Sequence, residues 1–304
     1  MLSIHTNYTS LLTQNNLNKT SGAMDQAMQR ISTGFRVNSA SDDAAGLQIA
    51  TRLQSQVNGL STASRNSQDA ISMLQTAEGA FDEMTNIAHR MKDLATQAAN
   101  GTNSTSEHDA MQAEWDSLAL ELESIVDNTQ FGSGNHLFAD GGLLDGDMTF
   151  QIGASTDETL TVNVKDALDD IKTAIGSSEN NSGLFGITLH SDGEPVDPPD
   201  EESRTNVNAQ GAMDAIDALL NGDDDTAGIG SIRSELGANI NRLDHTITNL
   251  GNMRENTEMA KGRIMDTDYA VESSEMMKNQ MLTQMSMSML SQANGMSGMV
   301  MSLI

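Results

Sequence analysis

The stretch that decides the fold runs from Leu47 to Leu94 and reads LQIATRLQSQVNGLSTASRNSQDAISMLQTAEGAFDEMTNIAHRMKDL. Its apolar residues recur mostly at intervals of three, four and seven, which is typical of a helix face that packs along a partner helix. We therefore expect one very long helix that ends near Asn100, before the turn-forming residues 101–104. The stripe comprises Leu47, Leu53, Val57, Leu60, Ile71, Leu74, Phe81, Met84, Ile87, Met91 and Leu94.

A second helical stretch precedes this helix and forms an N-terminal arm. Gly34 and residues 37–41 interrupt the helical pattern between the two. Ser39 and Asp42 have capping-box spacing, and we expect Asp43 to add a second acid in the first turn of the long helix. The apolar positions of the arm are Ile4, Leu11, Leu12, Leu17, Met24, Met28 and Ile31.

After the long helix the chain is predicted to turn back on itself. Ser104 and Glu107 have the spacing of a second capping box. Apolar residues then follow at helical intervals, so we expect an antiparallel return helix on the long one. They are Met111, Trp115, Leu118, Leu122 and Ile125.

The apolar period changes from helical to two near residues 148–164. Phe150 and Ile152 alternate with polar residues, as do Leu160 and Val162, and residues 153–157 between them are rich in turn formers. This pattern predicts a β-hairpin with one apolar face.

The second half of the chain returns to helical spacing. We expect a short helix over 165–175, a modest one over 206–220 and a clean apolar seam over 229–253. A last helix is expected over 267–293, closed by Asn294 and Gly295. The predicted fold class is mainly α, with long antiparallel coiled-coil helices from both chain ends and a small β-hairpin region.

The last helix is rich in methionine and ends in an apolar tail. Nine methionines lie between Met276 and Met301, and the chain closes on Val300, Leu303 and Ile304. Such a tail indicates a surface that a partner covers, and the N-terminal arm offers a matching stripe. A core stripe of an ordinary helix bundle is the alternative. The face includes Met277, Met281, Met285 and Met289.

Composition limits the classes of partner. The net charge of −27 argues against binding of nucleic acid or of an anionic membrane. The absence of cysteine removes disulfides and thiol chemistry. The polar start predicts no secretory signal, and no apolar run is long enough for a membrane span.

Acidic residues concentrate in the middle of the chain. Residues 181–204 contain Pro195, Pro198 and Pro199 among several acids, so we expect a short acidic exposed insert without regular structure. The acidic run 223–225 lacks the spacing of a calcium-binding EF-hand loop, and the histidines show no metal-ligand spacing. We expect no catalytic centre, no metal and no cofactor.

Eight motifs occur in order along the two ends of the sequence. The first half contains QRISTGFRVNSASDDAAGL at 29–47, RNSQDAISMLQTAEG at 65–79 and LATQAANGT at 94–102. The second half contains ELGA at 235–238, NRL at 241–243, TNLG at 248–251, IMDTDYA at 264–270 and SQAN at 291–294. With these motifs the chain resembles the bacterial flagellins, the subunits of the flagellar filament. The methionine-rich last helix departs from the family's usual Leu, Ala and Gln, and resembles the lateral-type members.

The resemblance implies a structural subunit that polymerises into a helical filament for motility and is exported unfolded by the flagellar secretion apparatus. Residues 1–40 and 264–304 would form an inner layer that is disordered in the monomer. Residues 41–180 and 205–263 would form an outer layer. The hairpin near 148–164 would be the switch that sets filament form. The implied partners are further copies of the chain, the export chaperone, the filament cap and the hook–filament junction proteins, and the implied location is the extracellular filament.

The family resemblance also implies a surface recognised by a host Toll-like receptor. The matching residues are Arg90 and Leu94 on the long helix and Glu114 on the return helix. A plain surface ion pair between Arg90 and Glu114 is compatible with this role. Two alternative functions stay open: a hook–filament junction protein, and a coiled-coil secreted protein that does not polymerise.

Overall fold

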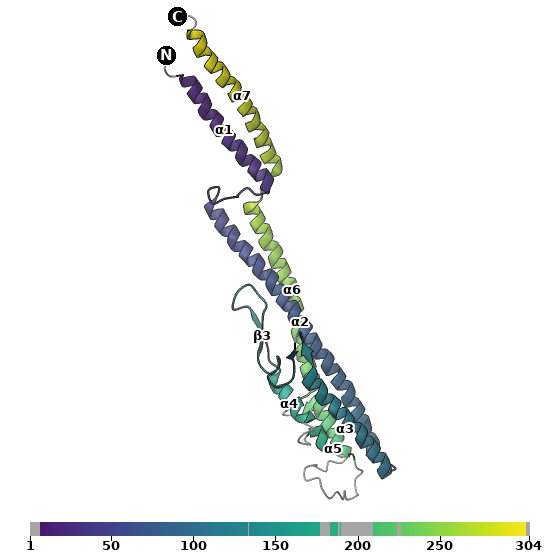
Figure 1. Ribbon diagram of the computed structural model, residues 1–304. Helices are drawn as coiled ribbons and strands as arrows, with labels where there is room; N and C mark the ends of the chain where they lie inside the picture. The colour runs from purple at the N-terminus through teal and green to yellow at the C-terminus, as the bar shows by residue number, and fades with distance from the viewer. Residues whose placement is uncertain are drawn as a thin grey trace. The chain divides into compact units, whose positions relative to one another are not determined.

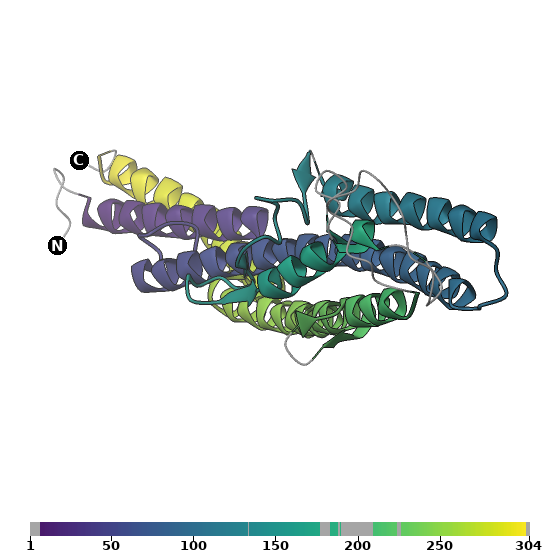
Figure 2. The ribbon, with the colours of Figure 1, turned by 90° about the horizontal axis from the view of Figure 1, so that it is seen from below.

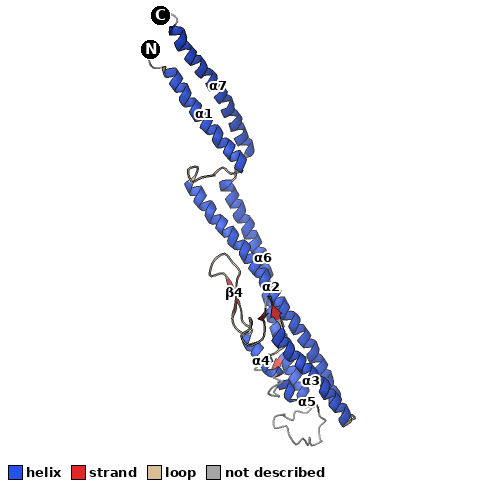
Figure 3. Ribbon diagram, viewed as in Figure 1, coloured by secondary structure: helices blue, strands red, loops and turns tan. Residues whose placement is uncertain are grey.

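A computed structural model describes residues 7–132, 134–176, 183–187, 189, 209–223 and 226–301. Its chain forms two compact units, each with its own packing. The terminal unit consists of residues 1–58 and 253–304, and the central unit of residues 59–252. Helices make up most of both units (Figure 3). The expectation of a mainly α fold with antiparallel helices and small strand pairs is confirmed.

The terminal unit is built on two helices from opposite ends of the sequence. These are α1 (Tyr8–Thr33) and α7 (Tyr269–Met301), which lie side by side in both ribbon views (Figures 1 and 2). The first part of α2 (Ala44–Ala98) and the last part of α6 (Ile229–Met265) complete the unit. The predicted end of the last helix at Asn294 and Gly295 is wrong, because α7 continues to Met301.

The boundaries of α1 follow from its capping residues. The Asn7 side chain accepts a hydrogen bond from the Ser10 backbone N–H at 3.1 Å, which satisfies a free donor of the first turn. At the other end Gly34 has a φ of 75°, and its N–H donates to the Arg30 carbonyl. A glycine adopts this left-handed conformation at low cost, so the helix ends where the sequence predicts.

The start of α2 differs from the predicted capping box. Asp43 precedes the helix, and its carboxylate accepts from the Gly46 N–H at 2.8 Å, so Asp43 rather than Ser39 caps the first turn. Asp42 instead closes the preceding loop by accepting from the N–H groups of Ser39 and Asn38. These bonds, with that from Ser39 largest, hold the pKa of Asp42 below its usual value.

The central unit packs shorter helices and strand pairs on the rest of α2 and α6. Its return helix is α3 (Thr105–Asn128), where Glu107 accepts from the Ser104 N–H at 2.7 Å as the sequence predicts. That hydrogen bond also lowers the pKa of Glu107. The other helices are α4 (Lys165–Ile175), η1 (Gly183–Gly186), a 3-10 helix, and α5 (Ala209–Asn221).

The described strands form three antiparallel pairs. The longest pair is β3 (Met148–Gln151) with β4 (Thr159–Val162), where the sequence predicts a hairpin. The shorter pairs are β1 (Gln130–Phe131) with β2 (Asn135–His136), and β5 (Gly222–Asp223) with β6 (Thr226–Ala227). Of the acidic insert predicted over 181–204, only residues 183–187 and 189 are described. There the prediction of an exposed, irregular segment is wrong, because η1 is helical and Leu184, Ile187 and Leu189 are buried in the core. The rest of the predicted insert lies outside the described residues.

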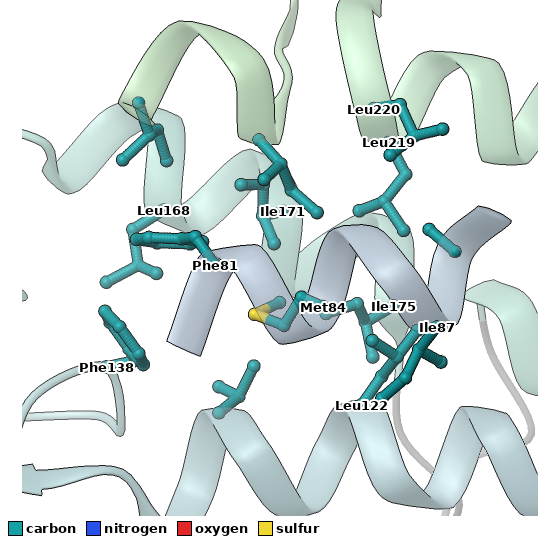
Figure 4. Close-up of a cluster of buried hydrophobic side chains, with 14 of the residues drawn as sticks. Phe81, Met84, Ile87, Leu122, Phe138, Leu168, Ile171, Ile175, Leu219 and Leu220 are labelled. Atoms are coloured by element: carbon teal, nitrogen blue, oxygen red, sulfur yellow. The ribbon is translucent and has the colours of Figure 1, made fainter. Parts of the chain in front are cut away.

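One contiguous apolar core holds the central unit together, and its buried residues all lie between Ala70 and Leu243. Phe81 of α2 and Phe138 place their ring centroids 4.8 Å apart. Leu168 of α4 lies near Phe81 in Figure 4, and Ile175 of α4 and Leu219 of α5 belong to the same core farther along the cluster. Trp115 of α3 is fully buried, and its indole N–H donates to the Leu184 carbonyl at 3.0 Å. The unit therefore has a core that contains no residue of α1 or α7.

Candidate functional site

The pairing of α1 and α7 uses a narrow seam with a heptad period. On each helix the buried and half-buried positions alternate between steps of three and four residues, as in a coiled coil. The seam is mixed in polarity rather than uniformly apolar. Its members are Ser10, Thr13, Leu17, Thr20, Met24, Ala27 and Ile31 on α1, and Glu272, Met276, Asn279, Thr283, Ser286, Leu290 and Ala293 on α7.

Polar contacts fix the antiparallel register of this pair at both ends. Near the chain termini Asn7 donates through its side-chain amide to the Ala293 carbonyl at 2.8 Å, and Ser10 donates to Asn294 at 3.0 Å. At the opposite end Arg30 forms an ion pair with Glu272 at 3.6 Å. The Glu272 side chain is only 8% exposed, so a slip in register would leave a buried charge without its partner.

The connections of α1 and α7 to their neighbours meet beside the ion pair. The Arg36 N–H donates to the Met265 carbonyl at 2.6 Å, and the Thr267 N–H donates to the Gly34 carbonyl at 3.0 Å. A Cβ added to Gly34 would lie 3.0 Å from the Tyr269 hydroxyl, in addition to the strain of its positive φ. These two hydrogen bonds join the segment that follows α1 to the segment between α6 and α7.

The four methionines of α7 that the sequence analysis singled out do not face α1. Met277, Met281, Met285 and Met289 are exposed, whereas Met276, Leu290 and Ala293 turn toward the seam. The pairing of the two chain ends, expected from their matching stripes, is present. The four methionines stay a prediction for contacts between subunits, since they do not contribute to the seam within the chain. An exposed apolar face remains along α7, beside the seam.

The predicted apolar positions of α1 divide in the same way. Leu17, Met24 and Ile31 lie in the seam, but Leu11, Leu12 and Met28 are exposed. The terminal unit thus carries exposed apolar side chains on both of its long helices. Ile4, Val300, Leu303 and Ile304 belong to the same prediction, and their side chains lie outside the described residues.

The hairpin packs its apolar side on the core as predicted. Phe150 pairs with Leu160, and Met148 pairs with Val162. Leu160 and Val162 are buried, while Phe150 and Ile152 are half-buried against the core. The register places these side chains on one face, because alternate residues of a strand point the same way.

Two contacts hold the far end of the hairpin against α2. The Asn66 side-chain amide donates to the Gln151 carbonyl at 3.2 Å. At Gly59 an added Cβ would lie 2.9 Å from the Ala154 Cβ, a distance that real contacts do not reach. A glycine inside a helix costs about 1 kcal/mol relative to alanine, and this close approach explains why one is present.

Two residues of the predicted receptor surface, Arg90 and Glu114, come together, whereas the third, Leu94, differs from them in exposure. Arg90 Nε donates to Glu114 Oε1 at 2.8 Å, and the two side chains are 51% and 44% exposed. Leu94 is buried in the core, with 1% of its surface exposed. A partner can therefore reach Arg90 and Glu114, whereas direct contact with Leu94 is excluded in this structure.

Sequence reasoning missed the polar members of the seam. Thr13, Thr20, Thr283 and Ser286 occupy heptad positions that a search for apolar side chains alone passes over. Counting small polar residues as seam positions would have found the period. The Arg30–Glu272 ion pair could not be predicted from the sequence, because oppositely charged residues at distant positions are common in any chain.

The described residues include no cluster of acidic, histidine or cysteine side chains that could hold a metal ion. None of the helices in the described ranges has the length and apolarity needed to cross a membrane.

Comparison with known proteins gives one consistent result. The bacterial flagellin N-terminal helical region matches residues 4–141, and the bacterial flagellin C-terminal helical region matches residues 219–304. The chain is 35% identical to polar flagellin F of Vibrio parahaemolyticus, with 96% of both chains covered. It is 35% identical to flagellin A of Vibrio anguillarum, covering 100% of this chain and 99% of the relative. It is 40% identical to a flagellin of Halalkalibacterium halodurans, covering 88% and 87%.

Proposed function

The chain belongs to the bacterial flagellin family, and we propose that it polymerises into the flagellar filament through its paired terminal helices, α1 and α7. Flagellins are structural proteins, and this chain is a structural subunit of the extracellular filament. The observation that supports assembly through the terminal helices is their exposed apolar side chains. While the seam joins α1 to α7, these side chains remain available to neighbouring subunits.

The energetics favour association of these faces. Burying a methionine side chain completely contributes about 1.5–3 kcal/mol, and about half of each exposed methionine of α7 is still open to water. Several such residues per subunit, each covered by a neighbour, would offset the entropy of ordering the chain ends. The mixed seam is weak alone, so we propose that folding of the ends and polymerisation are coupled.

The layers and the further partners follow from family membership as proposals. Residues 1–40 and 264–304 would form the inner layer of the filament, and 41–180 with 205–263 the outer layer. This division concerns the polymer and differs from the two units of the single chain. The export chaperone, the filament cap and the hook–filament junction proteins are the proposed partners.

Seeded growth tests the proposed function. Purified chain is added to filament seeds, and electron microscopy measures filament length over time. We expect long filaments whose growth depends on chain concentration. A chain that stays monomeric beside growing control filaments would favour the non-polymerising coiled-coil alternative. A chain that caps seeds without extending them would favour a hook–filament junction protein.

The hairpin is proposed as the element that sets filament form, and Gly59 gives a sharp test. Gly59→Ala is expected to displace the hairpin, because the added Cβ meets Ala154. Filaments of this variant should differ from the parent in curvature by electron microscopy. Gly79→Ala is the matched control: it lies in the same helix with nothing within 4 Å of the added Cβ. It should raise stability by about 0.5–1 kcal/mol and leave curvature unchanged. Equal curvature in all three proteins would remove the hairpin from the proposal.

Arg90 and Glu114 are proposed as contacts for the host Toll-like receptor. Replacing both by alanine should abolish activation of receptor-bearing cells by the monomer, because a paired cation and carboxylate with exposed edges is a good contact site. The fold should persist, since an exposed ion pair contributes only about 0.2–1 kcal/mol. The control is Arg233→Ala with Asp82→Ala, a second ion pair of the central unit at 3.0 Å, whose side chains are 32% and 59% exposed. A Arg90/Glu114 variant as potent as the parent would exclude the assignment.

A further inference from the structure

We infer that five exposed methionines of α7 form a reversible oxidation site that controls whether a subunit can enter the filament. These residues, Met277, Met281, Met285, Met287 and Met289, are called the methionine face below. The inference rests on the proposed role of α7 in assembly, and it adds a modification that acts at that surface. The modifying agent is a peroxide or a hypohalous acid, the oxidants to which an extracellular thioether is open.

Exposure separates the methionine face from the other methionines of the protein. Its members are 54%, 61%, 59%, 50% and 59% exposed in sequence order. By contrast Met73, Met84, Met91 and Met111 of the central core are at most 6% exposed. Met276 lies on α7 itself but is half-buried toward α1. The methionines of this chain therefore range in solvent exposure from more than half exposed to fully buried, so they serve as internal controls for one another.

Methionine also supplies most of the apolar character of this part of α7. Between Met277 and Gly295 the only charged residue is Lys278, and the other apolar side chains are Leu282, Leu290 and Ala293. Leu290 and Ala293 already face the seam, so they are not available to a neighbouring subunit. Apart from Leu282, which is 41% exposed, the apolar character of the surface open to a neighbour thus depends on the state of five sulfur atoms.

The chemical step is a two-electron oxidation. The sulfur lone pair attacks one oxygen of hydrogen peroxide, an S–O bond forms and the O–O bond breaks. The sulfur is oxidised and the peroxide is reduced. The departing hydroxide takes up the proton of the hydroxyl now bound to sulfur, and leaves as water. The product, methionine sulfoxide, is polar and accepts hydrogen bonds.

Oxidation should block assembly because burial then costs energy. A sulfoxide oxygen enclosed between subunits without a donor loses its hydration, a cost of about 1–3 kcal/mol in proteins. Burying the sulfoxide therefore raises the free energy of assembly, whereas burying the thioether lowers it. Oxidised subunits would be excluded from growing filaments, whereas subunits already assembled would be protected by their neighbours. Methionine sulfoxide reductases would reverse the block in free subunits.

Peptide mass spectrometry after exposure to hydrogen peroxide tests the site itself. In the monomer the methionine face should oxidise at least about tenfold faster than the four core methionines, with Met276 between them. In washed filaments the same residues should slow by at least about tenfold. Equal rates for exposed and core methionines, or equal rates in monomer and filament, would overturn the inference.

Seeded growth tests the consequence. Peroxide-treated monomer should extend seeds at a small fraction of its untreated rate, and methionine sulfoxide reductases A and B together should restore that rate. Normal extension by monomer whose methionine face is oxidised would overturn the inference. A lost rate that the reductases fail to restore, after mass spectrometry shows the sulfoxides reduced, would do so as well.

Matched variants assign the effect to these residues. In the variant with leucine at all five positions of the methionine face, the ratio of treated to untreated growth rate should rise toward one. Met259→Leu alters a comparably exposed methionine on α6, at 48%, and should leave the sensitivity of the parent unchanged. Protection by Met259→Leu alone would place the sensitive residue elsewhere.

The test also separates this inference from the proposed function. Glutamine at the same five positions imitates the polarity of the sulfoxide. If the glutamine variant extends filaments normally, α7 does not assemble through this face, and both proposals fail. If that variant cannot extend filaments while oxidised parent protein can, only the oxidation inference fails.

Discussion

Deleting residues 1–30 or residues 280–304 is expected to leave a soluble helical chain that no longer extends filaments. Each deletion removes one partner of the α1–α7 seam, together with the exposed apolar side chains that we propose neighbours cover. The central core contains no residue of either segment, because its buried members lie between Ala70 and Leu243. The loss should therefore be one of assembly and not of folding.

Circular dichroism and seeded growth together check this expectation. The truncated chains should lose helical signal in proportion to the residues removed, and unfold at nearly the parental urea concentration. Their growth rate on seeds should fall below detection. A truncated chain that extends filaments at the rate of the parent would show that assembly does not depend on that end.

Trp115→Ala should cause the largest loss of stability of any single substitution considered. The side chain is fully buried and its indole N–H donates to the Leu184 carbonyl at 3.0 Å. Replacing a buried large aromatic by alanine costs about 3–5 kcal/mol, and the unpaired carbonyl adds to this cost. Because Trp115 is the only tryptophan, the free energy of unfolding should be measured by circular dichroism in urea.

Leu120→Ala provides the control on the same helix. Leu120 is an exposed residue of α3, so its removal should change the free energy of unfolding by less than about 0.5 kcal/mol. A Trp115→Ala protein as stable as the parent would contradict the packing of α3 against the segment around Leu184.

Long-period patterns were predictable from the sequence because each repeats over many residues. The stripe from Leu47 to Leu94 predicts α2, and the alternation about Phe150 and Leu160 predicts the β3–β4 pair. Helix ends were predictable where one residue type has a strong backbone preference, as at Gly34. The end of α7 was predicted wrongly at Gly295, because a glycine can lie within a helix, which it weakens without ending it.

Features that depend on contacts between distant residues were not predictable. Which methionines of α7 face α1 depends on the register set by Asn7, Arg30 and their partners, and none of these has a local signature. The burial of Leu94, while Arg90 and Glu114 stay exposed, likewise depends on how the helices of the central unit pack. The lateral-type resemblance stays a prediction, as do the layers of the filament.

Cryo-electron microscopy of the filament grown from this chain tests the central proposal most directly. The proposal predicts α1 and α7 paired through the heptad seam, with Met281 and Met285 covered by side chains of neighbouring subunits. A filament in which these two methionines remain open to solvent, or in which α1 and α7 of one chain are separated, would contradict it.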